Sequence, residues 1–149
     1  MLRKARSGDE PQILKIIKIV LGGYGLKTNP KETDIDITDI QKYYFNNSGY
    51  FAVIDNNGII GSYGIFKISN FTCELRKMYL LPEYHGKGFG KLMMEDVFIK
   101  AKELGYTEMI LETNRKLNKA IVLYQKYGFE EYCCDHFSDR CDFAMRIEL

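Results

Sequence analysis

A strand-like stretch runs into a helical one through a segment in which every second residue is glycine. Residues 71–81 read as a strand closed by Pro82, and residues 88–104 repeat apolar side chains at helical spacing. The segment between them holds three alternate glycines: Gly86, Gly88 and Gly90. Glycine lacks a Cβ and adopts positive φ, so the backbone can approach a ligand closely. With the free N–H groups and partial positive charge of a helix N-terminus, the segment suits an anion such as a pyrophosphate.

Two other glycine-rich phosphate loops fit this segment poorly. A Walker loop requires Gly-x-x-x-x-Gly-Lys followed by Ser or Thr, whereas Lys91 is followed by Leu92 and position 85 is a histidine. A dinucleotide fingerprint requires Gly-x-Gly-x-x-Gly after a first strand, whereas this spacing is Gly-x-Gly-x-Gly beyond the middle of the chain. A tight strand-to-helix turn without a ligand remains an alternative, because glycines also serve turns.

The remaining patterns predict short strands and helices in alternation. Strands are expected at residues 2–6, 50–54, 59–68, 71–81, 108–112, 129–134 and 141–148. Helices are expected from the N-cap Asp9 to the stop at Gly22, and at residues 37–45, 88–104 and 120–127. Asn57-Gly58 predicts a hairpin with positive φ at both residues. This order predicts a mixed α/β sheet in a single domain over residues 1–149.

The charge balance argues against nucleic acid as the main partner. The chain has 21 Lys and Arg against 20 Asp and Glu, whereas nucleic-acid-binding domains usually carry a basic excess. No apolar run approaches the roughly 18 residues of a membrane span. Residues 13–21 are interrupted by Lys15 and Lys18 and lack a signal-peptide pattern. A cytoplasmic location without a membrane partner is therefore expected.

Three of the four cysteines lie close together near the C-terminus, with His136 among them: Cys133, Cys134 and Cys141. Their spacing matches no common zinc site, and adjacent residues of a strand point to opposite faces. We therefore expect reduced thiols and no metal cofactor. A disulfide between Cys134 and Cys141 across a hairpin stays open.

Two motifs at a fitting separation resemble the GNAT superfamily of N-acetyltransferases. The family's central motif, Arg/Gln-x-x-Gly-x-Gly/Ala after a strand that ends near a proline, compares with Leu-Leu-Pro-Glu-Tyr-His-Gly-Lys-Gly-Phe-Gly at residues 80–90. A second motif compares with Ala-Ile-Val-Leu-Tyr-Gln-Lys-Tyr-Gly-Phe at residues 120–129. The resemblance implies a mostly antiparallel sheet flanked by helices and splayed at the fourth and fifth strands. It also implies acetyl-CoA as co-substrate. His85 departs from the family by replacing the usual Arg or Gln.

The resemblance assigns cofactor contacts along both motifs. The backbone of Met78, Tyr79 and Leu80 is expected to pair with the pantetheine arm. The phosphate contacts are expected from His85, Gly86, Lys87, Gly88, Phe89, Gly90 and Lys91. Asn118 and Asn114 are further candidates, although Asn118 stands six residues before Tyr124, where the family more often has seven. A helix N-cap is an equal alternative for Asn118.

Glu74 and Tyr124 are the catalytic candidates that the resemblance implies. An amine must lose a proton before it attacks a thioester, and Glu74 stands where several family members have a catalytic glutamate. A surface carboxylate paired with Arg76 or a lysine is the alternative. Tyr124 matches the family tyrosine that protonates the departing sulfur, since an ordinary tyrosine keeps its proton at pH 7. A core tyrosine on an amphipathic helix is the alternative.

The expected function is transfer of an acetyl group from acetyl-CoA to a primary amine by direct attack. A non-catalytic acyl-CoA sensor is the alternative. In the family the first helices and their loop form the acceptor wall, which makes Tyr24 and Leu26 weak substrate-binding candidates. Acidic residues nearby either attract a cationic amine or form a solvated helix face: Glu32, Asp34, Asp36 and Asp39. A homodimer is the oligomeric state that the family suggests.

Overall fold

The computed structural model describes residues 1–138 and 140–149. In these residues seven strands form one sheet in the order β1-β2-β3-β4-β5-β7-β6. The strands are β1 (Leu2–Lys4), β2 (Tyr50–Asp55), β3 (Ile59–Lys67), β4 (Thr72–Leu80), β5 (Glu108–Thr113), β6 (Glu130–Glu131) and β7 (Phe143–Glu148). The α-helices are α1 (Glu10–Gly22), α2 (Ile40–Tyr43), α3 (Phe89–Glu103) and α4 (Asn118–Lys126). All neighbouring strands are antiparallel except β4 and β5, which confirms the predicted mixed, mostly antiparallel sheet.

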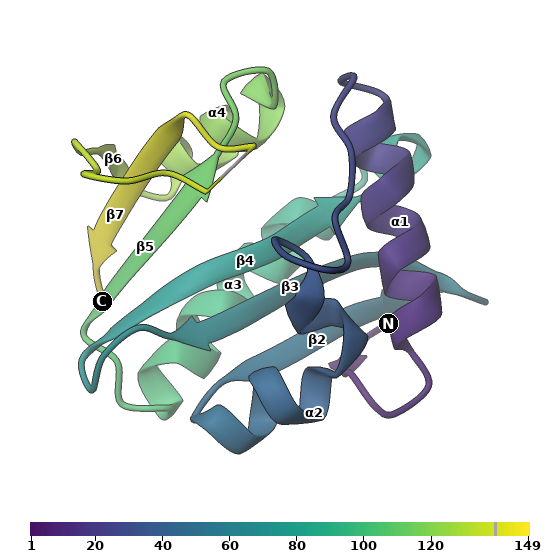
Figure 1. Ribbon diagram of the computed structural model, residues 1–149, viewed down its shortest axis with the longest axis horizontal. Helices are drawn as coiled ribbons and strands as arrows, with labels where there is room; N and C mark the ends of the chain where they lie inside the picture. Colours follow the sequence, from purple (N-terminus) through teal and green to yellow (C-terminus); the bar gives the residue numbers. More distant parts are fainter. Residues whose placement is uncertain (139) are drawn as a thin grey trace.

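Helices cover both faces of the sheet. Figure 1 shows α1 and α2 on one face and α3 on the other, with α4 beside β5 and β7. Each face has its own apolar core. The α1 side buries Ile13, Ile17 and Leu21 of the helix completely or nearly so, and the α3 side buries Met94 and Val97. The periodic apolar residues that predicted these helices are therefore their buried faces.

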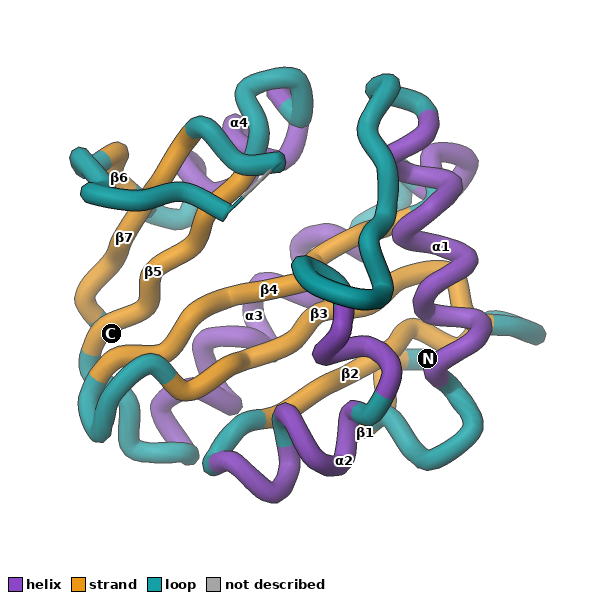
Figure 2. The backbone as a smooth tube through the Cα atoms, in the orientation of Figure 1, coloured by secondary structure: helices purple, strands orange, loops and turns teal. Residues whose placement is uncertain are grey.

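The sheet opens between β4 and β5. The two strands pair only from Thr72 to Glu74 of β4 and from Glu108 to Ile110 of β5. Beyond these residues β5 continues beside β7, while β4 continues beside β3, and the two strands diverge (Figures 1 and 2). The predicted splay at the fourth and fifth strands is thus confirmed. Backbone groups on the open edge of β4 need partners other than β5.

A bulge in β4 marks the start of this open edge. The register with β3 shifts between Ser62 and Gly64, and Lys77 opposite them has a φ of 53°. The Ser62 hydroxyl donates a 2.8 Å hydrogen bond to the Lys77 carbonyl and holds the bulge. Positive φ is uncommon for a residue with a side chain, so tertiary contacts must fix Lys77 here.

The predicted helix at residues 37–45 is wrong in its continuity. The segment forms a 3₁₀ turn at Ile35–Thr38, the four-residue α2, and a second 3₁₀ turn at Phe45–Asn47. Asp39 breaks it with a φ of −155°, and its side chain accepts a 3.1 Å hydrogen bond from the Lys42 N–H as the cap of α2. An aspartate in a helical pattern thus serves as a start signal for a new helix.

The strands predicted at the C-terminus are also too long. The strand expected at residues 129–134 is reduced to β6, and the one expected at 141–148 begins at Phe143. Side-chain contacts with distant residues take the place of a hairpin ladder, as when Asp142 accepts a 2.8 Å hydrogen bond from the Arg115 N–H. The other predicted elements match within about two residues, and Asn57 and Gly58 both have positive φ as predicted.

Candidate active site

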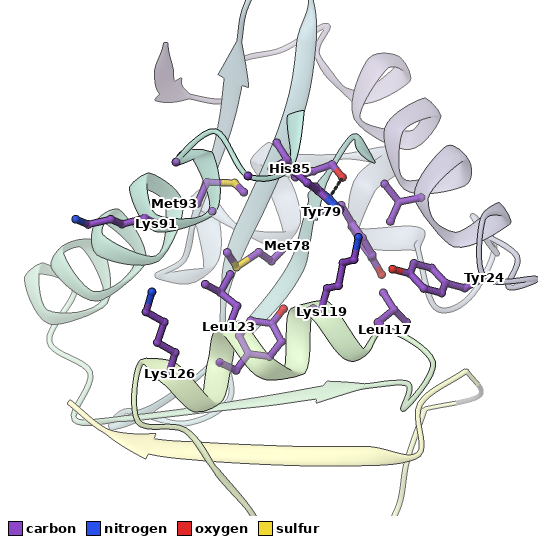
Figure 3. A pocket seen from close by; sticks show the side chains of 17 residues that line it. Tyr24, Met78, Tyr79, His85, Lys91, Met93, Leu117, Lys119, Leu123 and Lys126 are labelled. Atoms are coloured by element: carbon purple, nitrogen blue, oxygen red, sulfur yellow. Dashed lines mark hydrogen bonds between the residues drawn. The ribbon is translucent and has the colours of Figure 1, made fainter. Parts of the chain in front are cut away.

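A cavity of about 390 Å³ lies where the glycine segment faces α4 (Figure 3). We call it the loop cavity. Its walls come from β4, the start of α3, α4 and the end of α1. Of the site residues predicted from the sequence, it brings together Tyr24, Met78, Tyr79, Leu80, His85, Gly86, Gly88, Gly90, Lys91 and Tyr124. Residues predicted from separate motifs therefore share one space.

The glycine segment presents a row of free backbone donors to the loop cavity. Within the described chain, the N–H groups of residues 86–91 find no protein acceptor, and the first helical bond runs from the Leu92 N–H to the Gly88 carbonyl. Gly86 and Gly88 have φ of 74° and 88°, so the turn requires residues that tolerate positive φ. Successive free donors at the start of a helix of this length form a site for an anion.

Three lysines add positive charge to the loop cavity: Lys91, Lys119 and Lys126. Figure 3 shows Lys91 on α3, with Lys119 and Lys126 on α4. Sequence reasoning identified only Lys91. The spacing of the other two was the available signal, because residues seven apart lie on one face of a helix. The remaining wall is apolar and includes Val20, Met93 and Leu123.

The His85 side chain is fixed to the end of β4. Its Nε2 lies 3.1 Å from the Leu80 carbonyl oxygen, to which it donates when Nε2 carries the proton (Figure 3). Leu80 also lines the loop cavity. The residue that departs from the family motif therefore holds the strand end against the glycine segment.

Five of the predicted binding residues lie outside the loop cavity. Lys87 has its ammonium 5.5 Å from the Tyr84 ring, and Phe89 packs edge-on against the same ring. Leu26 packs on the core beneath α1. The other two, Asn114 and Asn118, both lie near the start of α4.

The two asparagines have different surroundings. The Asn114 side chain donates a 3.0 Å hydrogen bond to the Arg140 carbonyl and accepts one from the Lys116 N–H, so it holds the loop before α4. Asn118 is exposed as the first residue of α4, and Leu117 occupies the N-cap. Leu117 lines the loop cavity, although no sequence motif marks it.

A second cavity of about 280 Å³ lies where β4 and β5 diverge. We call it the splay cavity. Glu74 and Arg76 line it from β4, and Glu112 lines it from β5. Met78 and Tyr124 line both cavities. The two cavities therefore meet at these two residues.

The splay cavity is lined by two carboxylates with different hydrogen-bond partners. Glu74 is buried and accepts a hydrogen bond from the Arg76 Nε, so it forms the predicted ion pair, but inside the protein rather than at its surface. Glu112 accepts a 3.2 Å hydrogen bond from the Ser138 N–H. Burial raises the pKa of Glu112, the Ser138 N–H opposes that shift, and the charge of Glu74 adds to it. No sequence motif marks Glu112.

Tyr124 projects from α4 to the junction of the cavities. Its ring packs edge-on against Phe129 with centroids 5.8 Å apart, so the side chain belongs to the core as well as to the cavities. Burial raises the pKa of Tyr124, and Tyr79 adds to the shift. Its hydroxyl is therefore protonated at neutral pH, and it donates to no acceptor in the described residues.

Buried ion pairs hold two of the basic side chains that line the splay cavity, Lys77 and Arg140. Both terminal nitrogens of Arg140 donate to Asp34, at 2.8 and 2.6 Å, and the Lys77 ammonium lies 2.8 Å from the same carboxylate. Lys77 also contacts Asp36 at 3.4 Å. Asp34 and Asp36 are buried, so neither is the solvated helix face or the free attractive charge considered from the sequence. Glu32 is exposed and lines the cavity.

Other features of the described residues add no second site. The four cysteines are free thiols, so Cys134 and Cys141 are not bridged. Residues 1–138 and 140–149 contain no group of three or more His, Cys, Asp or Glu side chains placed to hold a metal ion. Their helices are all too short or too polar to cross a bilayer.

Comparison with known proteins gives a consistent result. Residues 46–131, more than half of the chain, match the acetyltransferase (GNAT) domain family. The uncharacterized N-acetyltransferase YjgM of Escherichia coli is 31% identical, with 100% of this chain and 95% of YjgM covered. An acetyltransferase from Streptococcus agalactiae has the same fold, with a TM-score of 0.91, 24% identity, and 100% and 98% of the two chains covered.

A structure determined with a cofactor also shares the fold. The phosphinothricin acetyltransferase of Sinorhizobium meliloti in complex with AcCoA has a TM-score of 0.76 at 23% identity, with 100% of this chain and 88% of that chain covered. The family match and the curated relative decide the classification, while the structural likeness concerns the fold. The chain therefore belongs to the GNAT superfamily of N-acetyltransferases and is an acyltransferase.

Proposed function

We propose that the protein transfers the acetyl group of acetyl-CoA to a primary amine by direct attack. The observation that carries this proposal is the meeting of two cavities at Met78 and Tyr124. One cavity suits a phosphate-bearing cofactor, and the other holds carboxylates that can take a proton from an amine. A reaction between two bound molecules needs such a junction, because the reacting atoms must come within about 3–3.5 Å.

The loop cavity suits the phosphate and pantetheine parts of acetyl-CoA. The free N–H groups of residues 86–91 suit the pyrophosphate. Lys91, Lys119 and Lys126 suit its remaining negative charge. The apolar wall and the open edge of β4 suit the pantetheine arm, which carries amides and methylene groups. The AcCoA complex of the Sinorhizobium meliloti enzyme, with the same fold, supports this choice of co-substrate.

The protein's own residues then move two protons. Bound acetyl-CoA supplies the acetyl thioester. Glu112 takes a proton from the ammonium group of the acceptor, which frees the nitrogen lone pair to form the new C–N bond. Tyr124 gives its hydroxyl proton to the sulfur as the C–S bond breaks. The products are the amide and the thiol of CoA. The second amine proton returns through solvent to the Tyr124 oxygen, and Glu112 releases its proton to solvent.

Glu112 is the better base of the two carboxylates. The Arg76 Nε donates a hydrogen bond to Glu74, so that carboxylate is already engaged by a charged side chain. Glu112 has a raised pKa and only a backbone N–H as partner within the described residues. We therefore propose Glu112 as the proton acceptor. Glu74, which the family resemblance suggested as the base, would instead act through its charge on the pKa of Glu112.

Thiol release tests the function directly. Acetyl-CoA binding is first measured by calorimetry, and thiol release is then followed for a panel of amino acids, amino amides, diamines and peptide N-termini. We expect binding, and release that requires an amine, with the acetylated product confirmed by mass spectrometry. Binding without release for any amine would replace the enzyme with an acyl-CoA sensor. Absence of binding would remove the assignment of the loop cavity.

A further inference from the structure

The three basic side chains that line the splay cavity differ in how many of their donors are already hydrogen-bonded within the protein. Lys77 directs its ammonium at the Thr33 carbonyl, 3.0 Å away, and at two aspartates. Arg140 directs both terminal nitrogens at Asp34. Arg76 uses only its Nε, which donates to Glu74. Among the described residues, the two terminal nitrogens of Arg76 have no acceptor.

Arg76 is nevertheless held in place. Its guanidinium carbon lies 3.6 Å from the centroid of the Phe66 ring, in a stacked cation–π contact. Glu74 accepts from the Nε edge of the group. The side chain is about 31% exposed and lines the splay cavity. A fixed guanidinium with free terminal N–H groups is preorganised for a carboxylate, which it binds through two parallel hydrogen bonds.

A negative charge opposite in sign to Arg76 is supplied by β5. Glu112 lines the same cavity from β5, and Tyr124 lies at the junction with the loop cavity. Three acidic residues line the splay cavity, Glu32, Glu74 and Glu112, and three basic ones, Arg76, Lys77 and Arg140. Asp34 and Asp36 already neutralise Lys77 and Arg140, so the groups of opposite charge left for a ligand are the terminal nitrogens of Arg76 and the Glu112 carboxylate. One group of each sign suits a molecule that carries both a carboxylate and an amine.

We propose that the acceptor is a small aminocarboxylate, an amino acid or a molecule of that class, whose carboxylate binds the terminal nitrogens of Arg76. Its amine then lies at the junction beside Met78 and Tyr124. The size of the cavity agrees with this class, because about 280 Å³ falls below the usual 300–1,000 Å³ of sites for larger ligands. The inference rests on the proposed acetyl transfer and adds the acceptor class to it.

Matched pairs of acceptors test the inference. Each amino acid is compared with its carboxamide, which keeps the amine and loses the negative charge. The wild-type protein is expected to show a kcat/KM about 10- to 100-fold higher for the acid, the range for hydrogen bonds to a charged group. Equal values for acid and amide, or a preference for diamines, would overturn the inference while acetyl transfer stands. Absence of transfer to any amine would overturn both.

The Arg76→Gln variant assigns the preference to this side chain. Glutamine can still donate to Glu74, but it lacks the positive charge and the two parallel terminal N–H donors of arginine. We expect the acid-over-amide ratio of kcat/KM to fall to about unity, and this ratio is the readout because it cancels any effect of the substitution on the catalysis of both acceptors. Lys67→Gln is the matched control, because it removes a charge from the neighbouring β3 outside both cavities, and it should keep the preference. A preference that survives Arg76→Gln, with acetyl-CoA affinity intact, would overturn the role of Arg76. If this variant does not fold, the wild-type comparison still decides the acceptor class.

Discussion

Glu74 on β4 and Glu112 on β5 line one cavity from two strands that have just separated. Burial raises the pKa of Glu112, and the charge of Glu74 adds to that shift. The two carboxylates have unequal partners. The Arg76 Nε donates to Glu74, whereas Glu112 has a backbone N–H as its partner in the described chain. When two carboxylates in one site have different surroundings, they can take different roles, and one of them can serve as the proton acceptor.

Glu112→Gln should remove the proton acceptor. We expect kcat/KM at pH 7 to fall about 10²- to 10⁴-fold, the range for loss of a general base. Glu108→Gln is the control, because Glu108 lies on the same strand but bonds to the Thr72 hydroxyl, 3.1 Å away, outside both cavities. A Glu112→Gln rate close to that of Glu108→Gln would return the base role to Glu74 or to water.

The same pair of acids predicts a shift of the pH profile. A base must be deprotonated, so kcat/KM rises with pH through the pKa of Glu112, which lies above the ordinary value for glutamate. Glu74→Gln removes the charge that contributes to this raised pKa. The acidic limb of the profile should then move to lower pH. An unmoved limb in Glu74→Gln, measured with the same acceptor, would show that Glu74 does not influence the base.

Tyr124→Phe should separate chemistry from binding. The phenyl ring keeps the contact with Phe129, while the proton donor is lost. We expect kcat to fall about 10²-fold or more, with the Kd of acetyl-CoA changed less than about 2-fold. Tyr127→Phe is the control, because Tyr127 caps the C-terminus of α4, packs beside Phe98 of α3 and lines neither cavity. Unchanged turnover in Tyr124→Phe would remove this residue from the acid role.

Gly88→Ala and Gly105→Ala form a matched pair. Gly88 has a φ of 88° and Gly105 a φ of 92°, and an added Cβ meets no neighbouring atom within 4 Å at either position. Each substitution should lower the free energy of unfolding by about 1–2 kcal/mol, the usual cost of left-handed backbone. Gly88 alone lines the loop cavity, so only Gly88→Ala should weaken acetyl-CoA binding, by about 10-fold or more. Equal acetyl-CoA affinities in calorimetry would contradict a phosphate site at this segment.

Asp34 predicts a loss of stability in acid. Burial opposes its ionisation, but the hydrogen bond from Arg140 and the charge of Lys77 prevail and lower the pKa of Asp34 to about 2. A lowered pKa contributes stability above the unfolded value near pH 4, and the contribution is lost as pH falls toward 2. The shift corresponds to about 2 kcal/mol.

Urea unfolding at pH 5 and pH 2 measures this contribution. The stability difference between the wild type and Asp34→Asn should shrink by about 2 kcal/mol between the two pH values. Glu32→Gln is the control, because Glu32 is exposed on the same loop, and its difference should stay nearly constant. A pH-independent difference for Asp34→Asn would mean that the ion pairs do not stabilise the fold.

The sequence predicted what depends on local pattern. The apolar spacing of α1 and α3, the positive φ of Asn57 and Gly58, and the glycine turn before α3 all follow from properties of nearby residues. The splay between β4 and β5 followed from family resemblance rather than from pattern. Together they named most of the residues that line the loop cavity.

Contacts between distant segments were beyond such reasoning. Arg140 reaches Asp34 over 106 positions, so no local signal could show that the two form an ion pair. Glu112 faces Glu74 only because the strands carrying them are neighbours for three residues and then part. The broken helix at Asp39 has a local cause instead, because this aspartate caps α2 by accepting from the Lys42 N–H, and an apolar pattern alone does not show such a cap.

The central claim is that acetyl-CoA and the amine are bound together, on either side of Met78 and Tyr124. Initial rates measured at several concentrations of both substrates test it most directly. A complex of all three partners predicts double-reciprocal lines that intersect, and Cys141→Ser should keep this pattern although Cys141 lines the splay cavity. Parallel lines, with an acetylated protein trapped in the absence of amine, would contradict direct transfer at the junction.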